Sequence, residues 1–186
     1  MADESLHEER YNHELLQDNG VKLFFGEVNV ELCRDTIEFI LAENIKKSMS
    51  HLTLLINSPG GDVDSGFALV DIINGSKIPV YTTGVGAIAS MGLAIFITGK
   101  KGNRVLTPNT LIMSHQHTDC SFGKYHELVS CRKSQDIVQA MFVKHYRKHT
   151  NLNEKDVMKY LLSPSDTYIT SLEAKKMGIC DIVKEI

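Results

Sequence analysis

Three side chains that could perform chemistry lie in short segments where predicted strands meet loops or helices. Ser90 lies in GAIASMG, where small neighbours let the backbone turn sharply and leave the hydroxyl open to a ligand. His115 lies in IMSHQ, at the end of an apolar run, where a general base could take a hydroxyl proton. Asp166 lies in SPSDTY, just before a predicted helix. Serine, histidine and aspartate together indicate nucleophilic acyl transfer, in which the aspartate orients the histidine.

A fourth segment, NSPGG at residues 57–61, could stabilise negative charge on a substrate. A Gly-Gly turn after a strand can bring a backbone N–H against a carbonyl oxygen, and the N–H groups at the helix start after Ser90 could do the same. Each segment alone has an ordinary alternative, since NSPGG also makes a common turn and small residues often surround a serine in tight packing. The four segments together favour the catalytic interpretation.

The histidines could also indicate a metal site. His115 and His117 are spaced by one residue, but only Asp119 and Cys120 could support them, so no metal is expected. A lone histidine is more often structural or on the surface, which is the expectation for His117, His126, His145 and His149.

The predicted elements that position these residues alternate between strand and helix. Strands are expected at residues 21–30, 52–56, 80–85, 110–114 and 179–183, and helices at residues 31–46, 65–74, 122–150, 153–162 and 171–177. This alternation predicts an α/β fold with mostly parallel pairing. Residues 20–186 are expected to form a single domain after a flexible N-terminal segment, residues 1–19.

Composition excludes several classes of function. The chain has 186 residues, 42% hydrophobic and 23% charged, with a formal net charge of −3, which argues against a nucleic-acid partner. Its longest central apolar run, residues 93–98, is far too short to span a membrane, and the polar, acidic N-terminus lacks a secretory pattern, so a cytoplasmic location is expected. Its four cysteines form no CxxC pair and are expected to be free thiols.

Taken together, the segments resemble the Clp protease proteolytic subunit over about residues 21–184. The motifs that carry the likeness are LINSPGG ending at Gly61, ASMG containing Ser90, IMSHQ containing His115, and the stretch from Asp166 to Gly178. The resemblance implies a serine endopeptidase with Ser90 as nucleophile, His115 as base and Asp166 as orienting acid. It also implies that the backbone N–H groups of Gly61 and Met91 form the oxyanion hole.

The resemblance has further implications for fold and assembly. The fold would be the stacked βαβ arrangement, a β-superhelix, shared by Clp proteases and crotonases, with a projecting strand-helix handle at about residues 116–150. The subunits would form a homo-oligomeric heptameric ring, single or double, that encloses the active sites. An AAA+ unfoldase would feed in unfolded polypeptides and use the ATP, so the peptidase itself would need no cofactor. The chain has no GxxxxGK[ST] loop for a nucleotide.

The chain departs from the family pattern in ways that mark a divergent member. Pro164 and Ser165 replace a usual Asp-Arg pair, and residues 117–120 (HTDC) replace a Pro-Leu-Gly-Gly-like run that pairs with the substrate. The pocket that docks the unfoldase is usually aromatic, whereas the matching positions here are Thr53, Leu55, Gly75 and Val105.

Three other interpretations remain open. The chain could be a catalytically weak or inactive Clp-like structural ring subunit. It could belong to the crotonase class, with Asp62 or Asp64 as the acid–base group beside the oxyanion hole. It could use a Ser-Lys dyad, as a membrane-linked signal-peptide peptidase would, with Lys100 or Lys101.

Overall fold

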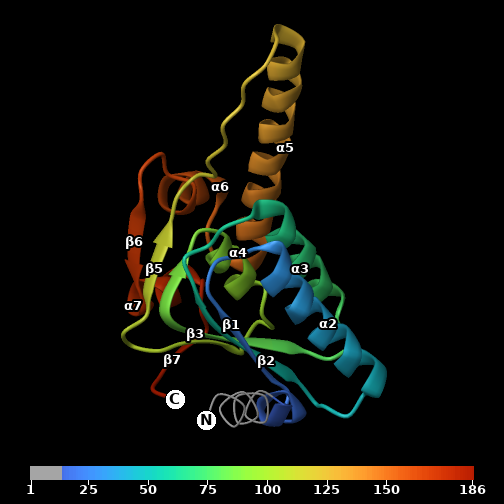
Figure 1. Cartoon of the computed structure of the whole chain (residues 1–186). Helices are drawn as coiled ribbons and strands as arrows, with labels where there is room; N and C mark the ends of the chain where they lie inside the picture. The colour runs from blue at the N-terminus through green and yellow to red at the C-terminus, as the bar shows by residue number, and fades with distance from the viewer. Residues whose placement is uncertain (1–13) are drawn as a thin grey trace, which may run out of the picture.

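The computed structural model describes residues 14–186, so most of the predicted flexible segment, residues 1–19, lies outside the described part of the chain. A body of sheet and helices carries one long helix, α5, that projects beyond it with an extended limb alongside (Figure 1). This arrangement agrees with the predicted α/β fold and handle. No helix within residues 14–186 is both long and apolar enough to cross a membrane.

The strands of the sheet are β1 (Val21–Phe25), β2 (Leu52–Ser58), β3 (Val80–Ala89), β4 (Arg104–Leu106), β5 (Leu111–Ser114), β6 (Thr167–Thr170) and β7 (Ile182–Val183). Four run in the order β1-β2-β3-β4, with β7 beyond β4, and all of these pairs are parallel. The long strand β3 pairs with β4 along its middle and with β5 at its end. Strand β6 then adds to β5 in the antiparallel direction.

The helices are α2 (Val30–Lys46), α3 (Val63–Gly75), α4 (Met91–Ile97), α5 (Tyr125–His149), α6 (Glu154–Asp156), the π-helical turn η1 (Val157–Leu161) and α7 (Ser171–Met177). Asn29 begins α2 by accepting a hydrogen bond from the Leu32 N–H, and Asp62 begins α3 in the same way through the Ser65 N–H. Strand β1 therefore ends at Phe25 rather than continuing to residue 30, since the chain must turn into the α2 cap.

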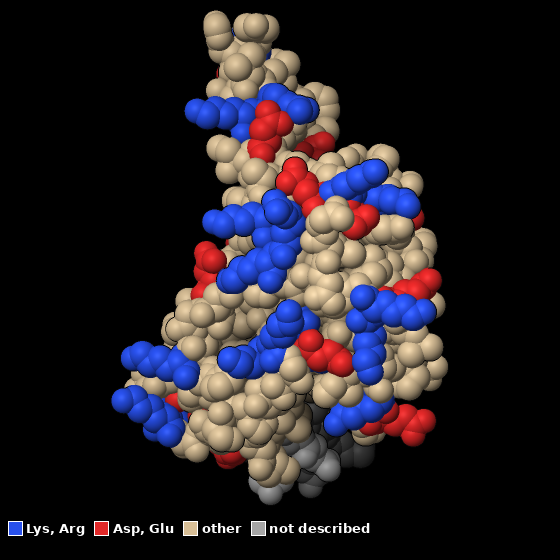
Figure 2. Space-filling model, turned by 180° about the vertical axis from the view of Figure 1, so that it is seen from behind, with Lys and Arg blue, Asp and Glu red and all other residues tan. Residues whose placement is uncertain are grey.

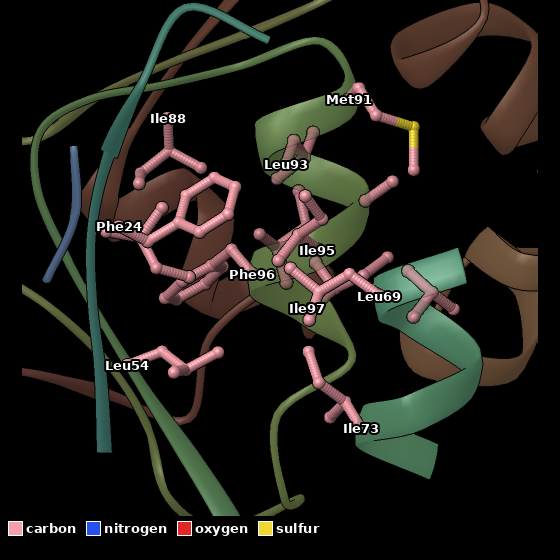
Figure 3. Packing of buried hydrophobic residues seen from close by; sticks show 14 of the residues in the cluster. Phe24, Leu54, Leu69, Ile73, Ile88, Met91, Leu93, Ile95, Phe96 and Ile97 are labelled. Atoms are coloured by element: carbon pink, nitrogen blue, oxygen red, sulfur yellow. The ribbon is translucent and has the colours of Figure 1, made fainter. Parts of the chain in front are cut away.

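The core is built around α4, which is apolar on every side. Leu93, Ile95 and Phe96 have no exposed surface, as expected for a helix without a polar face that lies inside the protein. Figure 3 shows these side chains between Phe24 and Leu54 of the sheet and the residues of α3. This burial fixes α4, and with it the residue that precedes its first turn, Ser90.

The handle leaves large apolar side chains exposed. Within the described residues, Phe122 is 89% exposed and Tyr125 is 75% exposed, and both lie near its tip. The handle seen from behind carries mostly uncharged side chains at the tip and charged ones lower down (Figure 2). Toward the body, Phe142 and Tyr146 of α5 are buried in the core. The helix predicted over residues 122–150 is therefore buried at one end, and at the other end the single chain leaves its apolar side chains exposed.

Candidate active site

Ser90 joins β3 to α4 in a backbone conformation that non-glycine residues rarely adopt. Its φ is 50° and its ψ is −122°, and Lys47 is the other non-glycine residue of the described chain with a positive φ. Such strain costs on the order of 1–3 kcal/mol and persists where the surroundings hold it. The Ser90 N–H donates to Met113 O at 2.9 Å, which ties this turn to β5.

The Ser90 hydroxyl is not used to cap its own helix. Ser90 occupies the N-cap position of α4, but its side chain makes no capping hydrogen bond. A serine at this position ordinarily accepts a bond from an N–H in the first turn. The N–H of Met91, the first residue of the helix, also has no intrahelical acceptor. An uncommitted hydroxyl therefore lies beside an available backbone donor.

The NSPGG turn packs directly against Ser90. A Cβ on Gly60, whose φ is +93°, would lie 2.6 Å from the Ser90 Cβ, so only glycine allows this approach. The Val28 N–H donates to Gly60 O and the Asp62 N–H donates to Val28 O. These two bonds leave the Gly61 N–H out of the bridge with Val28. Within residues 14–186, the Gly61 N–H thus has no backbone acceptor and can donate to a ligand.

His115 and Asp166 lie just beyond the end of the β5–β6 ladder, His115 after the last residue of β5 and Asp166 before the first residue of β6. Ser114 pairs with Thr167, so His115 and Asp166 are the next residues on the two strands. The Gln116 N–H donates to Ser163 O rather than continuing that register, so the chain bulges around Asp166. His115 is partly buried, whereas Asp166 is exposed.

A cavity of about 60 Å³ brings part of the predicted set together. Ser90, His115 and Gly61 line it, whereas Asp166 does not. Among residues 14–186, no hydrogen bond joins Ser90 to His115 or His115 to Asp166. Hydrogen bonds in free active sites are often long and tighten only when substrate binds. The structure therefore brings the predicted nucleophile, base and one backbone donor to one cavity, and the predicted acid, Asp166, is not among the residues that line it.

The base of α5 forms one wall of this cavity through Phe142 and Tyr146. Burial raises the pKa of Tyr146 to about 12, while its hydrogen bond with Ser114 acts in the opposite direction. The Ser114 hydroxyl donates to Leu161 O at 2.6 Å. These bonds join α5 and η1 to β5, the strand that His115 directly follows.

His145 joins the same end of α5 to α4. Its Nε2 lies 2.8 Å from Ala94 O, and because a carbonyl can only accept, the ring donates from this nitrogen. Burial lowers the pKa of His145 to about 4, with smaller opposing and supporting effects from its neighbours. A neutral, buried imidazole therefore fixes the base of the handle to the helix that begins after Ser90.

The structure weighs against the alternative chemistries. Asp62 caps α3, and the hydrogen bond with Ser65 is the largest cause of its lowered pKa, so this carboxylate already has a structural role. The Lys100 N–H donates to Val80 O at the start of β3, a ten-residue strand whose far end precedes Ser90, so Lys100 lies at the opposite end of this strand from Ser90.

The sequence predicted Ser90, His115 and Gly61, which line the cavity, but it did not predict the other residues that line it. His117 was expected to be structural or on the surface, but it lines the cavity with Ser90, next to Thr118. Phe142 and Tyr146 lie within the helix predicted over residues 122–150, but no sequence pattern placed them beside Ser90. His145 has the structural role predicted for it. All four cysteines are free thiols, as expected, and burial raises the pKa of Cys33 and Cys180 to about 11.

Comparison with known proteins gives one consistent result. The family model described as Clp protease matches residues 4–186. The chain is 30% identical over 154 residues to the ATP-dependent Clp protease proteolytic subunit 2 of Treponema denticola, an alignment that covers 83% of this chain and 76% of that protein. The chain therefore belongs to the Clp protease family.

Proposed function

We propose that this protein is a serine endopeptidase in which Ser90, His115 and Asp166 act as nucleophile, general base and orienting acid. The observation that carries the proposal is the single cavity shared by Ser90, His115 and Gly61. The strained backbone of Ser90 and its uncommitted hydroxyl support its role as nucleophile.

The proposed reaction follows from these positions. The Ser90 Oγ attacks the carbonyl carbon of a peptide bond while His115 takes its proton. The N–H groups of Gly61 and Met91 stabilise the negative charge on the carbonyl oxygen of the tetrahedral intermediate. His115 then gives the proton to the leaving amine, which departs and leaves an acyl-enzyme. Water, activated by His115, hydrolyses this ester and restores the Ser90 hydroxyl.

Asp166 would act through His115 rather than on the substrate. Its place one position beyond the Ser114–Thr167 pair supports a role in which it fixes the ring tautomer and stabilises the imidazolium. For the side chains of Asp166 and His115 to form a hydrogen bond, the bulge between Gln116 and Ser163 would have to close slightly. We infer that this closure accompanies assembly or substrate binding.

The proposal extends to assembly. We infer that the subunits form a heptameric ring, single or double, in which neighbouring subunits cover the exposed apolar side chains of the handle, such as Phe122 and Tyr125. Unfolded polypeptides would enter the ring with the help of an AAA+ unfoldase, and the ATP would be used by that partner. None of the matching positions, Thr53, Leu55, Gly75 and Val105, is aromatic, which implies that the docking contact differs from an aromatic one.

Hydrolysis of a short fluorogenic peptide by the purified protein tests the mechanism. Ser90→Ala and His115→Ala are expected to abolish cleavage, and Asp166→Asn to slow it by several orders of magnitude. Ser130→Ala, at an exposed position on α5, is the matched control and should cleave at the wild-type rate. Full activity in Ser90→Ala would reject the mechanism.

Mass measurement under native conditions tests the assembly. A ring of about seven subunits, or twice that number, is expected. A ring that assembles but shows no cleavage dependent on Ser90 would favour the inactive structural subunit instead. A monomer at micromolar concentration would reject the ring.

A further inference from the structure

The hydroxyl of Ser58 is buried next to the NSPGG turn and takes no part in the proposed chemistry. Ser58 is the last residue of β2, and it has no exposed surface. Its Oγ accepts a hydrogen bond from the Gly60 N–H at 3.2 Å. Among residues 14–186, this is the one side-chain hydrogen bond that reaches the backbone of residues 59–61. The hydroxyl therefore links the end of β2 to the turn that follows it.

Two hydrogen bonds, one on each side of the Gly60 Cα, set the direction of the Gly61 N–H. Before this Cα lies the Gly60 N–H, which Ser58 holds. After it lies Gly60 O, which accepts from the Val28 N–H at 2.8 Å. The peptide between Gly60 and Gly61 is trans, so its C=O and N–H point in opposite directions. The Gly61 N–H therefore points away from the Val28 N–H, and Gly61 lines the cavity beside Ser90.

Ser58 also contacts α4, the helix that supplies the second proposed donor. A Cβ on Gly92 would lie 3.0 Å from the Ser58 Cβ and 3.1 Å from its Oγ, so the first turn of α4 packs against Ser58. Gly92 directly follows Met91, which is 1% exposed and begins α4 (Figure 3). The Met91 side chain packs on Gly66 of α3, where any Cβ would overlap it. One buried serine thus contacts both segments that carry the proposed oxyanion donors.

We propose that Ser58 is a positioning residue whose hydroxyl holds the turn so that the N–H groups of Gly61 and Met91 point at the same oxygen. This inference rests on the proposed peptidase function. Ser58 is fully buried and does not line the cavity, so it would act only through the turn. Without the hydroxyl, the Gly60 N–H loses its acceptor, and the turn can move relative to α4.

The expected effect falls on the chemical step. Backbone donors of this kind stabilise charge that develops in the transition state, and removing one donor outright typically lowers kcat by about 10²–10³-fold. A donor that is displaced but still present should cost less. We therefore expect Ser58→Ala to lower kcat by about tenfold and to leave KM within about twofold of the wild-type value.

Two inhibitors of the same peptide sequence, one an aldehyde and one the corresponding alcohol, test the inference in the assembled full chain. Ser90 Oγ would bond to the aldehyde carbon, its proton would pass to His115, and the carbonyl oxygen would become an oxyanion facing the two N–H groups. The alcohol has no carbonyl at this position and binds through the other contacts alone. The ratio of the two inhibition constants should shrink about tenfold in Ser58→Ala, in step with kcat.

Two further variants separate the hydrogen bond from packing and from stability. Ser58→Cys fills the same place, but sulfur is a weak acceptor, so its loss should match that of Ser58→Ala. Ser171→Ala is the matched control, because Ser171 is 3% exposed and donates to Pro108 O at 2.8 Å. It should lose stability and keep the wild-type ratio. An inhibition constant does not depend on the fraction of protein that is folded, so the ratio can be measured in a destabilised variant.

The outcomes distinguish the positioning role from the peptidase function. If cleavage depends on Ser90 but the ratio is unchanged in Ser58→Ala, the role of Ser58 is rejected and the peptidase stands. A wild-type ratio in Ser58→Cys would reject the hydrogen bond as the cause, and an equal loss in Ser171→Ala would reduce the effect to general destabilisation and reject the role as well. If no cleavage depends on Ser90, the proposed function itself fails, and the inference fails with it.

Discussion

Replacement of Gly60 by alanine tests whether the close approach of the NSPGG turn holds Ser90 in place. The new Cβ would lie 2.6 Å from the Ser90 Cβ, 2.9 Å from Ala89 O and 3.0 Å from the Met91 N. Two of these neighbours are backbone atoms, so no flexible side chain can move aside. The φ of +93° adds strain that glycine does not have.

The two effects can be given approximate magnitudes. Forcing a non-glycine residue into this backbone region costs about 1–3 kcal/mol, and inserting a methyl group into a packed site costs about 1–3 kcal/mol more. Gly60→Ala should therefore lower the free energy of unfolding by about 2–6 kcal/mol. Any relaxation that relieves the contact moves Ser90 and should also reduce peptide hydrolysis.

Gly75→Ala is the matched control. Gly75 ends α3, a Cβ there meets no atom within 4 Å, and its φ is not in the positive range, so alanine should be neutral or stabilise the protein by up to about 1 kcal/mol. Both variants would be compared by urea unfolding at one fixed protein concentration and by peptide hydrolysis. A Gly60→Ala protein as stable and as active as the wild type would refute this account of the turn.

The other predictions concern the packing beneath the site. Because the pKa of His145 is about 4 in the folded state, below its ordinary value of 6.5, its stabilising contribution is complete above pH 6.5 and is lost as the pH falls toward 4. The free energy of unfolding should therefore fall by ~3 kcal/mol between these pH values. If the free energy of unfolding depends on pH in the same way in the wild type and in His145→Leu, this prediction is wrong. Arg104→Met should destabilise the protein by about 3 kcal/mol because Arg104 is 1% exposed and pairs with Asp181 at 2.7 Å. Arg132→Met, which breaks an exposed pair with Asp136, should lower the free energy of unfolding by at most about 0.5 kcal/mol. If urea unfolding shows that Arg104→Met and Arg132→Met destabilise the protein equally, the distinction between the buried and the exposed pair is wrong.

The proposed site residues could be predicted from the sequence because they lie at boundaries that leave local signals, and the structure places Ser90, His115 and Gly61 around one cavity. Ser90 follows a strand and starts a helix, and the glycines of NSPGG mark a turn wherever they occur. The run at residues 93–98 was recognised as apolar, but only the structure shows that every residue of α4 is buried. The local sequence pattern therefore predicts where the chain turns, whereas the residues that pack against each turn are known only from the structure.

The short elements and the walls of the cavity left weaker signals. Strand β3 was expected to end at residue 85, but it continues to Ala89 past Gly86 because residues 87–89 pair with β5. Strands β4 and β6 have three and four residues, too few for a period-two pattern to stand out. His117 was expected to be structural or on the surface because nothing local shows that its ring stacks on Phe142, 25 positions further along the chain.

The most direct test of the central claim is to label the protein with a fluorophosphonate and map the modified residue by mass spectrometry. The account predicts that the label is found on Ser90, with no labelling of Ser90→Ala and greatly slowed labelling of His115→Ala. A label on any other residue, or undiminished labelling of Ser90→Ala, would contradict it.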